Sequence, residues 1–141
     1  MAGRFKMEKL PKYPHLKPED VAVWERFLSA NPDFFDSVDY DFRVGEGAPT
    51  PENLAENMAA DLKVLTQKQI DVVGYKNDVV WIVELKPKAD MRALGQVISY
   101  EILYKKQEGE QITTKKAVIA GGIENDLDGV YESNAIDVFI V

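Results

Sequence analysis

The chain of 141 residues contains no cysteine. It can therefore form neither a disulfide framework nor a thiolate metal site, and we expect a reducing environment, the cytoplasm. No apolar run approaches the roughly 18 residues that a membrane span needs, and the first residues lack the pattern of a signal peptide. We expect no membrane partner.

Histidine is almost as scarce, with His15 as the single example. It lies between Pro14 and Leu16, in a segment without apolar periodicity. A partly exposed side chain in an irregular segment explains this residue more simply than a metal ligand or a catalytic base does.

Basic residues are fewer than acidic residues and are unevenly distributed along the chain. The formal net charge is −7, which argues against unspecific binding of nucleic acid through bulk charge. Residues 1–17 nevertheless hold five basic residues against Glu8 alone, a net charge of +4, so the remaining residues carry −11. We expect a basic irregular arm over 1–17, either a solvated tail or a nucleic-acid contact, and a single acidic domain over 18–141.

The apolar pattern is that of one α/β domain. Hydrophobic residues make up 45% of the chain, enough for a substantial core. Periodicity predicts helices over 18–30, 52–65 and 89–107, strands over 36–44, 70–75, 79–86, 116–122 and 135–141, and a short helix or turn before the last strand. A strand–helix–strand unit places its two strands in parallel. We therefore expect a mixed central β-sheet flanked by helices.

Two of these elements have a predicted buried face. The strand over 36–44 alternates strictly and leaves its aspartates on the exposed side. Its expected buried side chains are Val38, Tyr40, Phe42 and Val44. The helix over 89–107 has an apolar stripe at helical spacing. Its expected buried side chains include Met91, Leu94, Ile98 and Ile102.

Two charges interrupt the most hydrophobic strand, "VVWIVELK" at 79–86. Glu84 and Lys86 are two residues apart, so their side chains share one face of the sheet. Asp71 lies near the start of the preceding strand. If the hairpin turn is Asn77-Asp78, Asp71 pairs with Glu84.

A hairpin turn at Lys76-Asn77 gives nearly the same arrangement. Asp71 would then pair with Ile82, one step from Glu84 and on the same face. Any turn with an even number of residues preserves this parity, whereas an odd turn or a bulge breaks it. A turn with an even number of residues therefore places the two carboxylates on the same face.

Two carboxylates on neighbouring strands repel each other, and burial without a partner costs several kcal/mol. A hard divalent cation removes the conflict, because Mg²⁺ binds through one or two carboxylates and keeps several waters. Lys86 could then stabilise negative charge on a phosphate. Alternatively, Lys86 neutralises Asp71 and Glu84 as a structural ion pair.

The arrangement of Asp71, Glu84-Leu85-Lys86 and a following helix with Gln96 resembles the PD-(D/E)XK nuclease superfamily. That family has a restriction-endonuclease-like core in the order α-β-β-β-α-β, which residues 18–120 fit. Ile70 departs from the motif, because it stands where the family name has proline. The resemblance implies Mg²⁺ or Mn²⁺ as cofactor and DNA, less often RNA, as substrate. It also implies hydrolysis by a metal-activated water.

The resemblance also implies roles for particular residues. It makes Asp71 and Glu84 metal ligands, with the Leu85 carbonyl as a further ligand. It makes Lys86 the catalytic lysine and Gln96 a group that helps position the water or phosphate.

The helices supply the remaining candidates. Many family members add a glutamate from the first helix, for which Glu25 is the first candidate and Asp20 the rival. Arg92, Gln96 and Tyr100 recur at four-residue spacing and form one ridge. Lys88 and Arg92 flank the expected site, so they either contact phosphates or are ordinary surface residues, and Tyr100 is a further candidate for substrate binding.

Three hypotheses follow. The first is a metal-dependent deoxyribonuclease that acts as a homodimer or with a partner protein. The second is a catalytically inactive relative of the same fold that serves as a binding or assembly module. The third is a protein in which the charged cluster is only a structural ion pair.

Overall fold

The computed structural model describes residues 3–141 and contains one five-stranded mixed sheet in the order β1-β2-β3-β4-β5. Its strands are β1 (Ser37–Val44), β2 (Lys68–Lys76), β3 (Val79–Lys86), β4 (Thr114–Ala120) and β5 (Ile136–Ile140). Strands β1, β2 and β3 pair antiparallel, and β3, β4 and β5 pair parallel. The predicted mixed α/β sheet is confirmed.

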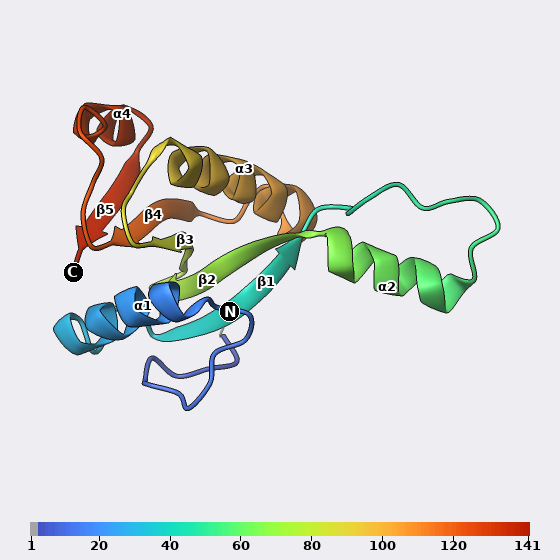
Figure 1. Cartoon of the computed structure of the whole chain (residues 1–141), viewed down its shortest axis with the longest axis horizontal. Coiled ribbons are helices and arrows are strands. Elements are labelled where there is room, and N and C mark those ends of the chain that lie inside the picture. The colour runs from blue at the N-terminus through green and yellow to red at the C-terminus, as the bar shows by residue number, and fades with distance from the viewer. Residues whose placement is uncertain (1–2) are drawn as a thin grey trace.

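Helices cover both faces of the sheet (Figure 1). They are α1 (Pro18–Ala30), α2 (Glu56–Thr66), α3 (Met91–Glu108) and α4 (Asp128–Ser133). Helix α1 packs on one face, where Trp24 donates a hydrogen bond from Nε1 to the Tyr40 hydroxyl at 2.9 Å. Helix α3 packs on the opposite face through Tyr100 and Tyr104. No described helix is long and apolar enough to cross a membrane.

The predicted apolar face of α3 is partly wrong. Met91 and Ile102 are 69% and 61% exposed. The residues that the helix buries are instead Ala93, Val97, Tyr100 and Tyr104. Leu94 and Ile98 are partly buried and pack against a core cluster, so only Met91 and Ile102 of the predicted face lie on the outer side.

The predicted alternation of β1 holds only as far as Tyr40. Val38 and Tyr40 pack in the core beneath α1, but Val44 and Phe42 pack in the core beneath α3. Between them Asp41 has a φ of 51°, a left-handed conformation that interrupts the regular pleat. The side chains therefore change faces at this residue. The expectation of exposed aspartates on β1 is also wrong, because Asp39 is buried.

The hairpin between β2 and β3 turns at Asn77-Asp78. Both residues have positive φ, 48° and 65°, as a two-residue type I′ turn requires. Lys76 pairs with Val79 across the turn, and the register continues to Val72 opposite Val83. The same register extended by one residue places Asp71 opposite Glu84.

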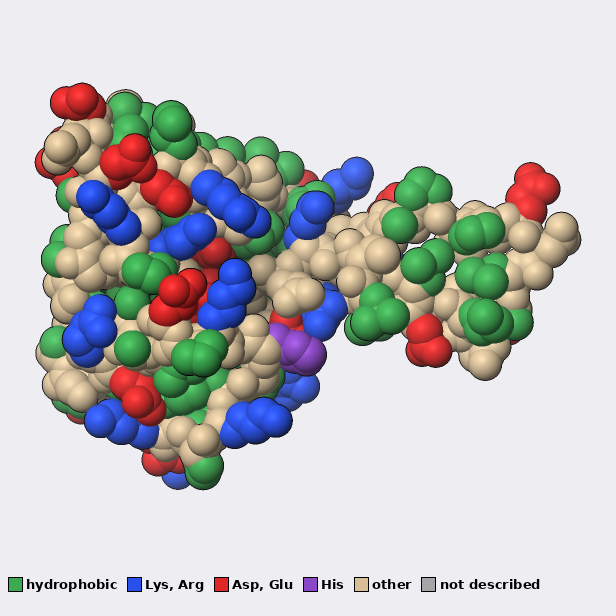
Figure 2. All heavy atoms as spheres, in the orientation of Figure 1, with side chains coloured by type: hydrophobic (Ala, Val, Ile, Leu, Met, Phe, Trp, Pro, Cys, Tyr) green, Lys and Arg blue, Asp and Glu red, His purple; other side chains and the backbone are tan. Residues whose placement is uncertain are grey.

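Helix α2 and the loop before it project from the body of the molecule (Figures 1 and 2). The helix has no buried residue. Met58, Val64 and Leu65 are at least half exposed. At the base of the projection, Arg43 donates a hydrogen bond to the Val64 carbonyl, and Ala48 N–H donates one to Thr66 Oγ1.

The N-terminal segment, residues 3–17, contains no helix and no strand beyond one bridge. That bridge joins Phe5 to Val38 of β1. Tyr13 is buried in the core beneath α1, and Leu10 and Leu16 pack against it. The described part of the arm is therefore fixed to the α1 face of the body.

Candidate active site

Most of the predicted site residues meet in a cleft of about 340 Å³ beside the start of β2 and the end of β3. The end of β3 contributes Glu84, Leu85 and Lys86. Strand β2 contributes Asp71, and the first turn of α1 contributes Asp20. The α3 wall of the cleft comprises Arg92, Gln96 and Tyr100.

The cleft exists because β2 and β3 separate beyond the pair Val72–Val83. The Leu85 N–H then has no backbone partner on β2 and donates a hydrogen bond to Asp71 Oδ2 at 3.0 Å. In a strand, the N–H and C=O of one residue project to the same edge. The Leu85 carbonyl therefore also projects toward Asp71, while the Leu85 side chain packs in the core beneath α1.

The carboxyl groups of Asp71 and Glu84 are close enough to perturb each other. Burial raises the pKa of Glu84 to about 10, and the charge of Asp71 and a hydrogen bond to it contribute further. Burial also raises the pKa of Asp71. Glu84 Oε1 is buried without a hydrogen-bond partner among the described residues. Without a bound cation, the cleft therefore disfavours the simultaneous ionisation of both carboxyl groups.

Lys86 lies beside these acids without forming an ion pair with them. Its charge opposes the rise in pKa of both Asp71 and Glu84. Within residues 3–141, the ion pairs closer than 4.0 Å do not include Lys86. The ammonium group is therefore available to a ligand in the cleft, and nothing in this geometry supports a structural ion pair.

The ridge predicted on α3 faces the cleft. Gln96 donates a hydrogen bond from Nε2 to the Tyr100 hydroxyl at 3.3 Å, while its Oε1 is buried and has no partner in the described part of the chain. Burial, and next the charge of Glu84, raises the pKa of Tyr100. Arg92 is exposed at the rim. Gln96 Oε1 is thus a free acceptor beside the acidic pair.

The structure places Asp20 in the cleft and Glu25 outside it, which corrects the first choice for the α1 acid. Burial, and next the charge of Asp71, raises the pKa of Asp20 to about 6. Glu25 instead accepts a hydrogen bond from the Tyr13 hydroxyl at 2.9 Å. Five residues correspond to about 140° around a helix, so the two acids point in different directions.

Three basic residues that the sequence did not identify also line the cleft. They are His15, Lys17 and Lys68. The sequence contained a signal for Lys17, because it precedes α1 and lies three residues before Asp20. No local pattern indicated His15. Lys88, by contrast, is exposed beyond the end of β3 and is not among the residues that line the cleft.

The donor set suits a hard divalent cation with few protein ligands. The described residues contain no group of three or more histidine, aspartate or glutamate side chains arranged to hold a metal. Asp71, Glu84 and the Leu85 carbonyl offer oxygen ligands, and Mg²⁺ commonly takes one or two carboxylates and completes its shell with water. The unpartnered Glu84 Oε1 and the raised pKa of its carboxyl group are the observations that fit such an ion.

No protein-family model and no curated protein matches the chain. Two solved structures do. One is a repair endonuclease from Pyrococcus abyssi, at 17% identity and a TM-score of 0.52, covering 92% of this chain and 49% of that one. The other is an EndoMS–dsDNA2 complex, at 14% identity and a TM-score of 0.52, covering 95% of this chain and 48% of that one.

The chain shares the restriction-endonuclease-like fold of these two structures. The predicted resemblance is thereby confirmed at the level of the fold. The chain spans about half the length of the two endonuclease chains that it matches. Within this fold, the cleft brings Asp71, Glu84 and Lys86 together at the end of the hairpin.

Proposed function

We propose that the protein is a metal-dependent deoxyribonuclease that hydrolyses DNA phosphodiester bonds. The single observation that carries this proposal is the convergence of Asp71 and Glu84 beside the unpaired ammonium of Lys86. The fold shared with two endonuclease structures supports it. One of these structures is a complex with double-stranded DNA, which favours DNA over RNA as substrate.

Asp71, Glu84 and the Leu85 carbonyl would hold the ion. When bound there, Mg²⁺ or Mn²⁺ lowers the pKa of a coordinated water and polarises the phosphoryl oxygen. Neutralising the two carboxylates also removes their mutual repulsion, so substrate phosphate can enter a cleft that is otherwise acidic.

The remaining cleft residues act on the water and the phosphate. Lys86 would stabilise the negative charge that grows on the phosphoryl oxygens as the bond breaks. Gln96 Oε1 is a free acceptor and would orient the attacking water by accepting a hydrogen bond from it. Asp20 would hold a further water of the ion's shell. Arg92 and Tyr100 would contact the substrate from α3, whereas Lys88 would contact it only outside the cleft.

A cleavage assay tests the proposal. Supercoiled plasmid and single-stranded DNA are incubated with Mg²⁺, with Mn²⁺ and with a chelator. Lys86→Ala is compared with Lys106→Ala, which removes an exposed lysine near the end of α3. We expect metal-dependent cleavage by the wild type and by Lys106→Ala, and none by Lys86→Ala. Cleavage that needs no metal, or that survives Lys86→Ala, contradicts the proposal.

The same assay addresses the alternative of an inactive module. Binding of Mn²⁺ without cleavage of either substrate would identify a binding or assembly role for the fold. A homodimer or a partner protein, and a cytoplasmic location, are further predictions from the sequence. Size-exclusion chromatography with light scattering tests the first of these.

A further inference from the structure

The cleft has basic residues on two sides, and only one side was expected. Arg92 comes from α3, which covers one face of the sheet. His15 and Lys17 come from the N-terminal segment, which packs on the α1 face. In Figure 2 the histidine side chain lies where the projection leaves the body, with Lys and Arg side chains beside it. The acidic floor therefore lies between two positively charged walls.

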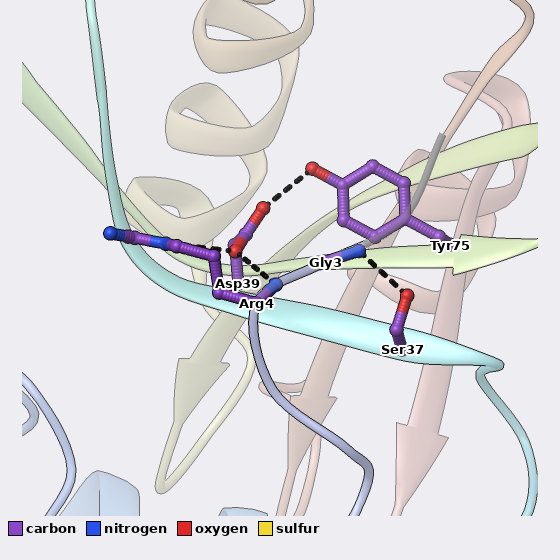
Figure 3. Close-up of polar contacts among 5 residues, drawn as sticks. All are labelled: Gly3, Arg4, Ser37, Asp39 and Tyr75. Carbon is purple, nitrogen blue, oxygen red and sulfur yellow. Dashed lines mark hydrogen bonds and ion pairs between the residues drawn. The ribbon is translucent and has the colours of Figure 1, made fainter.

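The arm that carries His15 and Lys17 is anchored at its start by Arg4 and Gly3. Arg4 donates to Asp39 Oδ1 from its backbone N–H at 2.9 Å and from Nε at 3.4 Å, and Gly3 N–H donates to Ser37 Oγ at 2.7 Å (Figure 3). The other oxygen of this buried aspartate accepts a hydrogen bond from the Tyr75 hydroxyl at 2.7 Å. These bonds fix the start of the described arm to the edge strand of the sheet.

Near the cleft, Asp41 holds the other end of the arm. His15 Nε2 lies 3.6 Å from Asp41 Oδ2, and His15 itself has a φ of 54°. L-residues rarely adopt this left-handed conformation, and its persistence indicates that surrounding contacts determine it. The imidazole is nevertheless 65% exposed. His15 is thus positioned by the protein while most of its side chain faces solvent at the cleft.

Among the described residues, the side chain of Lys17 forms no hydrogen bond, and its charge opposes the rise in the pKa of Asp20 in the cleft. Lys17 is exposed, it is the N-cap residue of α1 without a capping hydrogen bond from its side chain, and it forms no ion pair closer than 4.0 Å within the described residues. The domain that surrounds it is strongly acidic. A polyanion such as DNA can approach this acidic domain only where basic side chains lie along its path.

We propose that His15 and Lys17 form a second phosphate-binding wall, so that the DNA backbone beside the cleavage position passes between the N-terminal arm and Arg92. This inference rests on the proposed nuclease function. It assigns to the arm a specific contact in the cleft, distinct from a general attraction by its net charge of +4.

Binding measured without cleavage tests the wall directly. The affinity of the full chain for a fluorescent DNA duplex is measured with Mg²⁺ present, in the Lys86→Ala background that does not cleave, over a series of salt concentrations. The variants are Lys17→Ala, His15→Ala and Arg92→Ala, and the matched control is Lys12→Ala, an exposed lysine of the same arm that does not line the cleft. A phosphate contact contributes about 0.9 to the slope of log K against log salt.

We expect Lys17→Ala and Arg92→Ala each to weaken binding about 3- to 10-fold and to lower the salt slope by about 1. His15→Ala should weaken binding less, and Lys17→Arg should restore the wild-type affinity. In the cleavage assay, Lys17→Ala should raise KM with little change in kcat, because the contact lies beside the reacting phosphate. Lys17→Ala, Arg92→Ala and Lys12→Ala should unfold at the wild-type temperature.

Two different failures are distinguishable. If the wild type binds and cuts DNA but Lys17→Ala behaves like Lys12→Ala, the second wall is wrong and the nuclease proposal stands. If the wild type neither binds nor cuts DNA, both proposals fail together. A lower unfolding temperature for Lys17→Ala would show that the lysine supports the fold, which also overturns the inference.

Discussion

The backbone N–H of Leu85 donates to Asp71 Oδ2 at 3.0 Å, where an unbroken sheet would offer it a carbonyl of β2. A side chain thus satisfies the group that the separating strands leave open. The same hydrogen bond orients the Asp71 carboxylate toward Glu84. The separation of β2 and β3 therefore also fixes the carboxyl group of Asp71 in the acidic site.

Asp71→Asn should separate these two roles. The amide oxygen can still accept the Leu85 hydrogen bond, so the fold should persist with an unchanged unfolding transition. The negative ligand is lost, and Mn²⁺ affinity measured by calorimetry should fall by more than about 10-fold, the lower limit for losing even a supporting group. Asp126→Asn, in an exposed turn, is the matched control. Unchanged Mn²⁺ affinity would contradict the assignment of Asp71 as a ligand.

Glu84→Gln should stabilise the metal-free protein at neutral and alkaline pH. Burial raises the pKa of Glu84 from 4.5 to about 10, so the folded state holds this proton more tightly than the unfolded state does. Through this group, the free energy of unfolding decreases as the pH rises from about 4.5 to about 10. The variant removes that loss, and its melting temperature at pH 8 should exceed the wild type's by about 5 °C.

Calorimetry in chelator from pH 5 to pH 9 provides the measurement. The difference between Glu84→Gln and wild type should grow with pH, and added Mg²⁺ should stabilise only the wild type. Glu110→Gln, which removes an exposed carboxylate, controls for net charge. A difference that stays constant across the pH range would refute the buried-acid explanation.

The core of the site could be predicted because it depends on local rules. Alternation along a strand places Glu84 and Lys86 on one face, and the two-residue turn at Asn77-Asp78 fixes the register that brings Asp71 opposite. Both facts follow from short sequence separations. The buried face of α3 could not be predicted in this way, because Ala93 and Tyr104 contribute little to an apolar pattern that Met91 and Ile102 dominate.

Other features depend on contacts that no local pattern encodes. The reversal of faces in β1 requires the positive φ of Asp41. The place of His15 depends on how an irregular arm is held, at its start by Arg4 and near its end by the buried Tyr13. The α1 acid that lines the cleft could have been predicted, because Asp20 lies one turn before the buried Trp24, whereas Glu25 lies beside that stripe.

The acids of α1 offer a paired test. Asp20→Asn should lower metal-dependent cleavage by about 10-fold, as expected for a group that holds a water of the metal's shell. Glu25→Gln should leave cleavage unchanged, because Glu25 is bonded to Tyr13 outside the cleft. Single-turnover rates at saturating Mg²⁺ compare the two variants. A larger effect of Glu25→Gln would reinstate the glutamate as the α1 acid.

The projecting helix α2 predicts an unusual tolerance to polar substitution. Met58 and Leu65 are 54% and 74% exposed and α2 buries no residue, so Met58→Gln and Leu65→Gln should change the free energy of unfolding by less than about 0.5 kcal/mol. Val97→Ala, in the buried face of α3, should cost about 2 kcal/mol. Urea unfolding at two protein concentrations measures both. A loss near that of Val97→Ala that also depends on protein concentration would show that α2 is buried against a second copy of the chain, and would make the predicted homodimer part of the fold's stability.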